Sequence, residues 1–167
     1  GGTSSHTVTY RPVVGIITMS DGVTAGSRDN KSGEILSDGF ERAGCPIQKQ
    51  LVLPDGSEEL RETILSWIDS GVELIITTGG TGLGPRDLTI SLMETMFNSR
   101  LPGIEQALHA YGRGKLATAS LSRLAAGVVG PAIVICLPGS PEAVRDGLSV
   151  LIPSIFHAYH MMKGEGH

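Results

Sequence analysis

The chain has 167 residues and a net charge of −4; 40% of its residues are hydrophobic, 18% are charged and 4% are aromatic. These values are typical of one globular domain with a largely aliphatic core. A weakly acidic chain without a basic stripe argues against nucleic acid as the main partner, and no apolar run approaches the roughly 20 residues of a transmembrane helix.

Strands and helices are expected to alternate along the first half of the chain. A short β-branched apolar run predicts a buried strand over 13–19, and apolar residues at helical spacing predict a helix over 32–43. Residues 47–53 alternate in polarity, which indicates a weaker strand near the edge of a sheet. After a turn at 54–56, a helix is expected over 57–71, capped by its first serine.

The second half of the chain has a less regular pattern. The stretch that runs through residue 127 is expected to be irregular. Pro153 either separates two helices or kinks a continuous pair. The elements expected after residue 71 are strands at 72–77 and 132–137 and helices at 89–97, 104–111, 141–151 and 155–162.

The two cysteines indicate a reducing compartment. Cys45 and Cys136 form no C-x-x-C pair and are expected to be free thiols, with a disulfide as the less favoured alternative. No signal peptide is evident, so we expect a cytoplasmic protein. Residues 1–11 are expected to be an expression remnant or a flexible N-terminus, and residues 164–167 a flexible tail.

The loop after the strand at 72–77 carries the strongest functional signal. Its four glycines between Gly79 and Gly84 let the backbone turn N–H groups toward an anion, while Arg86 and Asp87 add a cation and a metal-binding carboxylate. Pro85 excludes both standard phosphate loops, because it replaces the lysine of a Walker A loop and the third glycine of the dinucleotide fingerprint. We therefore predict a different site for a phosphorylated ligand with magnesium, the alternative being a turn-rich connection.

The alternation of strands and helices predicts a three-layer α/β domain. Its sheet should be mainly parallel and covered by helices on both faces. Ligands bind such sheets outside the carboxyl ends of the strands. The polar loops at 20–21, 54–56, 79–87 and 138–141 follow predicted strands, so we expect them to meet along one edge.

Several motifs together resemble one family. They are Thr78-Gly79-Gly80-Thr81-Gly82 with Pro85-Arg86-Asp87-x-Thr89, Leu137-Pro138-Gly139-Ser140-Pro141, Ser20-Asp21, Asp29-x-x-Ser32-Gly33, Leu53-Pro54-Asp55 and Leu121-Ser122-Arg123-x-x-Ala126-Gly127. The set resembles the molybdopterin adenylyltransferases of the MogA/MoaB type, a family that includes the G domains of gephyrin and of plant Cnx proteins. The resemblance covers residues 12–163, which are expected to form the molybdopterin-binding domain.

The resemblance implies a reaction and its partners. Members bind ATP with Mg²⁺ and molybdopterin, transfer AMP to the terminal phosphate of molybdopterin, and release pyrophosphate late in molybdenum cofactor synthesis. On this basis we expect small-molecule substrates, a homotrimer, and a downstream molybdate-insertion protein as a partner. We expect neither nucleic acid nor a membrane as a partner.

The resemblance also implies residue roles. Asp55 and Asp87 match catalytic aspartates, and Asp87 would hold Mg²⁺; from the residues alone, Asp87 could cap a helix and Asp55 could be an ordinary turn residue. Arginines in such loops can equally form surface ion pairs. The other residues expected to bind are Ser20, Asp21, Gly79, Gly80, Thr81, Gly82 and Arg86 for the nucleotide and phosphates, and Ser122, Arg123, Pro138, Gly139 and Ser140 for molybdopterin.

Two alternative functions stay open at this point. One is a non-catalytic domain that binds molybdopterin or serves as a trimerising scaffold, since the family contains such relatives. The presence of both aspartates favours the enzyme over the scaffold. The other is a different nucleotide-dependent transferase built on the same fold.

Overall fold

A computed structural model of the chain describes residues 10–26, 29–54, 58–79, 88–112 and 124–164. Its strands are β1 (Val14–Met19), β2 (Ile47–Leu53), β3 (Leu74–Gly79), β4 (Ser99–Arg100), β5 (Ala125–Val129) and β6 (Ala132–Leu137). Its helices are α1 (Asp21–Thr24), α2 (Lys31–Arg42), α3 (Glu59–Asp69), α4 (Leu88–Met96), α5 (Pro102–Gly112) and α7 (Pro141–Gly164).

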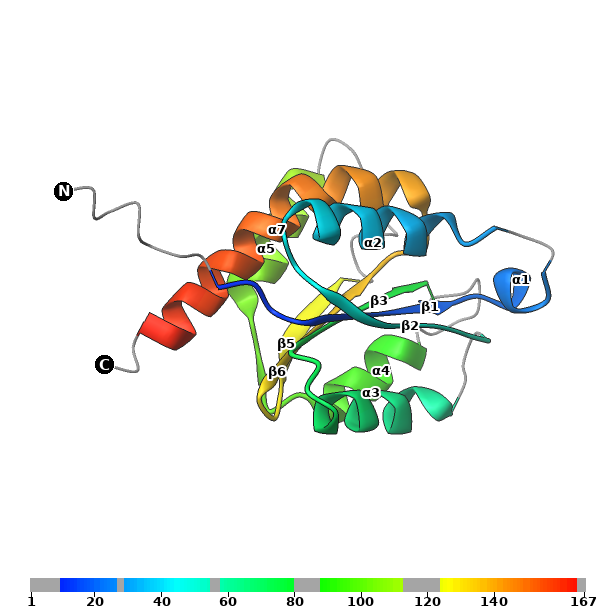
Figure 1. Cartoon of the computed structure of the whole chain (residues 1–167), viewed down its shortest axis with the longest axis horizontal. Helices are drawn as coiled ribbons and strands as arrows, with labels where there is room; N and C mark the ends of the chain where they lie inside the picture. Colours follow the sequence, from blue (N-terminus) through cyan, green and yellow to red (C-terminus); the bar gives the residue numbers. More distant parts are fainter. Residues whose placement is uncertain (1–9, 27–28, 55–57, 80–87, 113–123, 165–167) are drawn as a thin grey trace.

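The strands form one mixed sheet in the order β2-β1-β3-β6-β5-β4. The first four strands of this order run parallel, and β5 and β4 are antiparallel to their neighbours. The expected mainly parallel sheet with helices on both faces is therefore confirmed, and β2 lies at an edge as its alternating sequence predicted (Figure 1).

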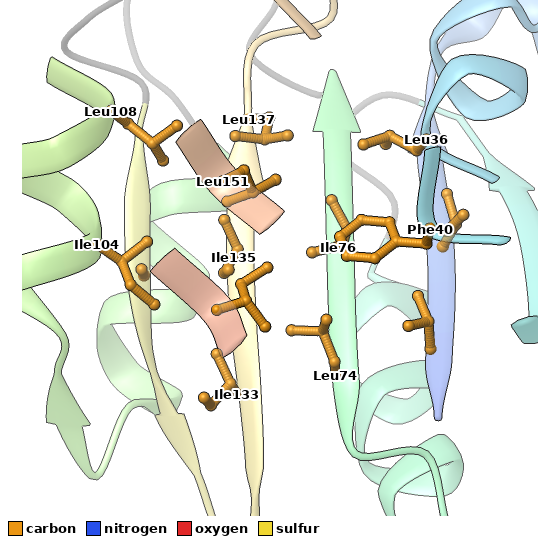
Figure 2. Close-up of a cluster of buried hydrophobic side chains, with 14 of the residues drawn as sticks. Leu36, Phe40, Leu74, Ile76, Ile104, Leu108, Ile133, Ile135, Leu137 and Leu151 are labelled. Carbon is orange, nitrogen blue, oxygen red and sulfur yellow. The ribbon is translucent and has the colours of Figure 1, made fainter. Parts of the chain in front are cut away.

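Two apolar cores hold the layers together. In β3, Leu74 and Ile76 pack with Phe40 of α2 on the face that α5 and α7 also cover, whereas Ile75 joins the core beneath α3 and α4. Figure 1 shows α2 and α7 on one side of the sheet and α3 and α4 on the other, and Figure 2 shows part of the first core. Because β3 is buried on both faces, its first three residues are all apolar instead of alternating with exposed polar ones, and the threonines that follow are buried as well.

The expectation that the chain is irregular through residue 127 was wrong, because strand β5 begins at Ala125. Ala125 and Ala126 are small, and Gly127 has no side chain, so only the last two residues of the five-residue strand are of the β-branched type that marks a strand. The small residue is required by packing: a Cβ on Gly127 would lie 2.4 Å from a ring carbon of Phe97. The two-residue strand β4, which pairs with β5, is too short to leave a sequence pattern.

The two helices expected near the C-terminus form one continuous helix, α7. Pro153 lies inside it, and Figure 1 shows the helix changing direction along its length. A proline lacks the N–H that would donate to the preceding turn and so favours a bend without ending a well-packed helix. The serine expected to cap α3 lies outside the described residues. Glu58 is the N-cap of α3, and its side chain makes no capping hydrogen bond.

Side chains hold the segment before β1 at the edge of the sheet where the parallel strands begin, which we call the amino edge. The Tyr10 hydroxyl donates to the Glu73 carboxylate, which also accepts from the Val13 N–H at 3.1 Å. Tyr159 of α7 donates to the Glu73 carbonyl, and its ring centroid lies 5.5 Å from that of Tyr10. The hydrogen bond to Glu73, together with burial, raises the pKa of Tyr10 from 10.0 to about 12, and burial also raises the pKa of Tyr159.

We expect Tyr10→Phe to make the stability of the protein less sensitive to alkaline pH. An unfolded tyrosine ionises near pH 10.0, whereas folded Tyr10 keeps its proton to about pH 12. The contribution of this proton is therefore present below pH 10 and is lost as the pH rises toward 12. Urea titrations across this range should show the free energy of unfolding falling more steeply in the parent chain than in the variant.

The same titrations contain their own control. At neutral pH the variant should be less stable by about 1 kcal/mol, because Glu73 loses one hydrogen-bond donor. Parallel curves for the two proteins from pH 10 to 12 would show that Tyr10 does not keep its proton in the fold.

Candidate functional site

The four parallel strands direct their carboxyl ends to one edge of the sheet, as the sequence predicted. Ser20 follows β1, Pro54 follows β2, Gly79 ends β3 and Pro138 follows β6. The chain leaves β1 and β6 toward α2 and α7 on one face, but it leaves β3 toward α4 on the other (Figure 1). Ligands of open parallel sheets bind where neighbouring connections part in this way, so the end of β3 is the expected site.

Backbone atoms from three strand ends touch at this position. Gly79 has a φ of +84°, and a Cβ there would lie 2.3 Å from the Met19 carbonyl oxygen at the end of β1. On the other side, a Cβ on Gly139 would lie 3.1 Å from the Gly79 Cα. Glycine is therefore required at the end of β3 for both its backbone angle and its close neighbours.

The end of β1 continues into the short helix α1. The Ser20 side chain caps this helix by accepting from the Val23 N–H at 3.3 Å, and the Ser20 N–H donates to the Leu53 carbonyl at 2.9 Å. Asp21, the first residue of α1, is exposed. The structure thus gives Ser20 a capping role that the sequence did not predict; its hydroxyl still has a proton to donate to a ligand.

A hydrogen-bond network ties the start of α2 to β1. Asn30 is the N-cap of α2, and its Oδ1 accepts from the Gly33 N–H at 3.1 Å and from the Thr18 hydroxyl at 3.0 Å. A Cβ on Gly33 would lie 2.5 Å from the Asn30 amide nitrogen, so a glycine here leaves room for the cap.

Two further hydroxyls hold the loop after β6. The buried Thr78 hydroxyl donates to the Pro138 carbonyl at 2.8 Å, and the Ser32 hydroxyl donates to the Gly139 carbonyl at 2.7 Å. Ser32 and Gly33 belong to a motif of the family resemblance, but no role was predicted for Ser32, Thr78, Thr18 or Asn30. Their partners lie far away in the sequence, so only the Asn30 capping pattern gave a local signal.

The structure brings the described part of the predicted site together. The residues at this edge are Ser20, Asp21, Gly79, Pro138, Gly139 and Ser140. The remaining predicted residues lie outside the described ranges, so their roles stay predictions; they are Asp55, Gly80, Thr81, Gly82, Arg86, Asp87, Ser122 and Arg123.

The edge is suited to bind anions through backbone groups. Helices α2 and α7 both begin here, and helix N-termini present N–H groups and the positive end of the helix dipole. Among the described residues, no cluster of three or more His, Cys, Asp or Glu side chains could hold a metal.

Comparison with known proteins identifies the family to which the chain is similar. The sequence matches the profile of a family described as a probable molybdopterin binding domain over residues 15–157. It is 50% identical over 166 residues to the molybdenum cofactor biosynthesis bifunctional protein of Chlorobaculum tepidum, covering 99% of this chain and 53% of that protein. The chain thus spans about half the length of this curated relative.

Two shorter relatives match along most of their length. The chain is 33% identical over 148 residues to the molybdopterin adenylyltransferase of Pyrococcus furiosus, covering 86% of each chain. Its fold superposes on a crystal structure of MoaB from Pyrococcus furiosus, described as a tungsten cofactor synthesizing protein, with a TM-score of 0.81 and 28% identity. That match covers 92% of this chain and 98% of the other.

We expect Gly79→Ala to destabilise the fold more than a left-handed backbone angle alone explains. The matched control is Gly71→Ala, because Gly71 has a φ of +102° but no atom within 4 Å of an added Cβ. The control should lose about 1–2 kcal/mol of unfolding free energy from backbone strain. Gly79→Ala should lose more, because its Cβ would meet the Met19 carbonyl, and equal losses in urea titrations would contradict the close contact.

Proposed function

Because the chain belongs to the family of probable molybdopterin-binding domains, with the MogA/MoaB proteins and gephyrin among its relatives, we propose that it is a molybdopterin adenylyltransferase. The proposed reaction is the Mg²⁺-dependent transfer of AMP from ATP to molybdopterin, giving adenylyl-molybdopterin and pyrophosphate. Relatives over the same region are named for molybdenum cofactor biosynthesis, and one is named for this activity.

One structural observation supports the proposal most. The ends of β1, β3 and β6 meet at an edge where helices α2 and α7 begin, in the region matched to the family. Such an edge suits a reaction between two phosphorylated molecules, because their negative charges must be brought together and compensated.

The reaction requires positioning more than covalent chemistry from the protein. A terminal phosphate oxygen of molybdopterin attacks the α-phosphorus of ATP, the new P–O bond forms, and the bond from the α-phosphorus to the bridging oxygen breaks. The electron pair of that bond leaves with pyrophosphate. The chain would contribute by holding both phosphates in line and by compensating charge with backbone N–H groups near Gly79 and Gly139.

The magnesium ion would compensate the charge of the leaving pyrophosphate when it is bound. We assign it to Asp87, with Asp55 as the second catalytic carboxylate, on the family resemblance. Arg86, in the same loop, would contact the nucleotide phosphates. Asp21, the first residue of α1, also provides an exposed carboxylate at the carboxyl edge of the sheet.

The enzyme is tested by incubating the protein with molybdopterin, Mg²⁺ and ATP labelled at the α-phosphate. We expect label on the pterin, and we expect Asp87→Asn to reduce the rate by about 100-fold or more, because it removes a carboxylate proposed to hold the metal. Asp69→Asn is the matched control, since Asp69 is an exposed carboxylate at the end of α3, toward the amino edge of the sheet.

The outcomes of this assay separate the enzyme from its alternatives. Tight molybdopterin binding without labelled product would mean a carrier or scaffold, and the roles of Asp55 and Asp87 would be withdrawn. Labelled product that forms without the pterin would mean a different nucleotide-dependent transferase.

We also propose that the domain forms a homotrimer and delivers its product to a molybdate-insertion protein. Sedimentation velocity should show a particle of about three times the 17.5 kDa mass of the chain. A monomer at micromolar concentration would contradict the trimer without bearing on the chemistry.

A further inference from the structure

We propose that Thr78 and Ser32 are positioning residues, whose hydroxyls orient the peptide groups of Gly139 so that its N–H binds a phosphate oxygen of the ligand. No ligand contact was predicted for either residue. The inference rests on the proposed function, because both substrates of that reaction carry phosphate.

The two hydroxyls reach the loop after β6 from different elements. Thr78 belongs to β3 and is fully buried, and its Oγ1 lies 2.8 Å from the Pro138 carbonyl oxygen. Ser32 belongs to the first turn of α2, is 6% exposed, and lies 2.7 Å from the Gly139 carbonyl oxygen. Because both donors are buried, water cannot readily replace them at these carbonyls.

The donors themselves are held in place. Thr78 lies in the central strand β3, between β1 and β6. Ser32 lies in a helix whose N-cap, Asn30, is bonded to the Thr18 hydroxyl of β1 at 3.0 Å. The positions of both hydroxyls are therefore set by the sheet and not by the loop that they hold.

Peptide geometry converts these bonds into a direction for the Gly139 N–H. The described residues contain no cis peptide bond, and in a trans peptide the N–H points opposite to the carbonyl of the same unit. The Pro138 carbonyl faces the buried Thr78 hydroxyl, so the Gly139 N–H points away from it, on a residue that is exposed. The Ser32 hydroxyl fixes the carbonyl of Gly139 itself, so Gly139 is held through the peptide groups on both of its sides.

A fixed N–H is suited to bind a phosphate oxygen. It needs no reorganisation when the anion arrives, which is the basis of backbone anion sites. The absence of a side chain at Gly139 also leaves the ligand free to approach the backbone. The phosphate could be that of ATP or the terminal phosphate of molybdopterin, and separate titrations distinguish the two.

The test uses calorimetric titration of the purified protein with Mg²⁺-ATP and, separately, with molybdopterin. The variants are Thr78→Val and Ser32→Ala, each of which removes one hydroxyl, and Thr78→Ser, which retains it. The matched control is Ser154→Ala, which removes a hydroxyl that donates to the Val150 carbonyl at 2.8 Å within α7. Melting temperatures are recorded for all proteins.

We expect Thr78→Val and Ser32→Ala to bind one of the two ligands about tenfold more weakly, which corresponds to the loss of one well-placed hydrogen bond. The other ligand should bind as tightly as it does to Ser154→Ala, and Thr78→Ser should bind within about twofold of the parent chain. The ligand that is affected is the one whose phosphate contacts Gly139.

Two results would overturn the positioning role. One is unchanged affinity for both ligands in Ser32→Ala and Thr78→Val. The other is an equal loss for both ligands that follows the melting temperature, which indicates a general distortion of the edge. If Thr78→Val does not fold, Ser32→Ala still decides. Binding needs no turnover, so a protein that binds but forms no labelled product refutes the proposed reaction without refuting this inference.

Discussion

Close backbone packing between the ends of β1, β3 and β6 is the constraint on which the candidate site depends. Gly79 lies against the Met19 carbonyl on one side and against Gly139 on the other. A side chain at Gly79 would collide with the Met19 carbonyl, so these strand ends contact one another through backbone groups. The connections lead to helices on opposite faces of the sheet, and such a division marks the usual ligand site of open parallel sheets.

The two edges of the sheet have different chemistry. At the amino edge, Tyr10 and Tyr159 bond to Glu73 and fasten the start of the chain to α7. At the carboxyl edge, the hydroxyls of Thr18, Thr78 and Ser32 bond to the connections that follow the strands or precede the helices. Side chains thus fasten one edge to the carboxylate and carbonyl of the half-buried Glu73, whereas at the other edge they fix the N-cap of α2 and the backbone after β6.

Most of the fold could be predicted because its central elements carry strong local patterns. Strands β1, β3 and β6 contain short apolar runs, and helices α2 and α3 have apolar residues at helical spacing. Both signals can be read from the local sequence without knowledge of tertiary contacts. Strand β5 could not be predicted, since it starts with small residues and its central Gly127 is required by contact with Phe97, which comes 30 residues earlier. The hydrogen bonds of Ser32 and Thr78 could not be predicted either, because their partners in the loop after β6 are far away in the sequence and come close only in the folded sheet.

The strand order also determines when the site exists during folding. Thr78 pairs with Leu137 in the sheet although 59 residues separate them. Contacts of such high sequence separation form late and slowly, because a long loop must close before the pairing is rewarded. A nascent or truncated chain that lacks β6 therefore has the end of β3 but not Gly139, which lies against Gly79 in the complete fold. Any ligand that binds this edge and not the unfolded chain would therefore stabilise the pairing of β3 with β6 by mass action.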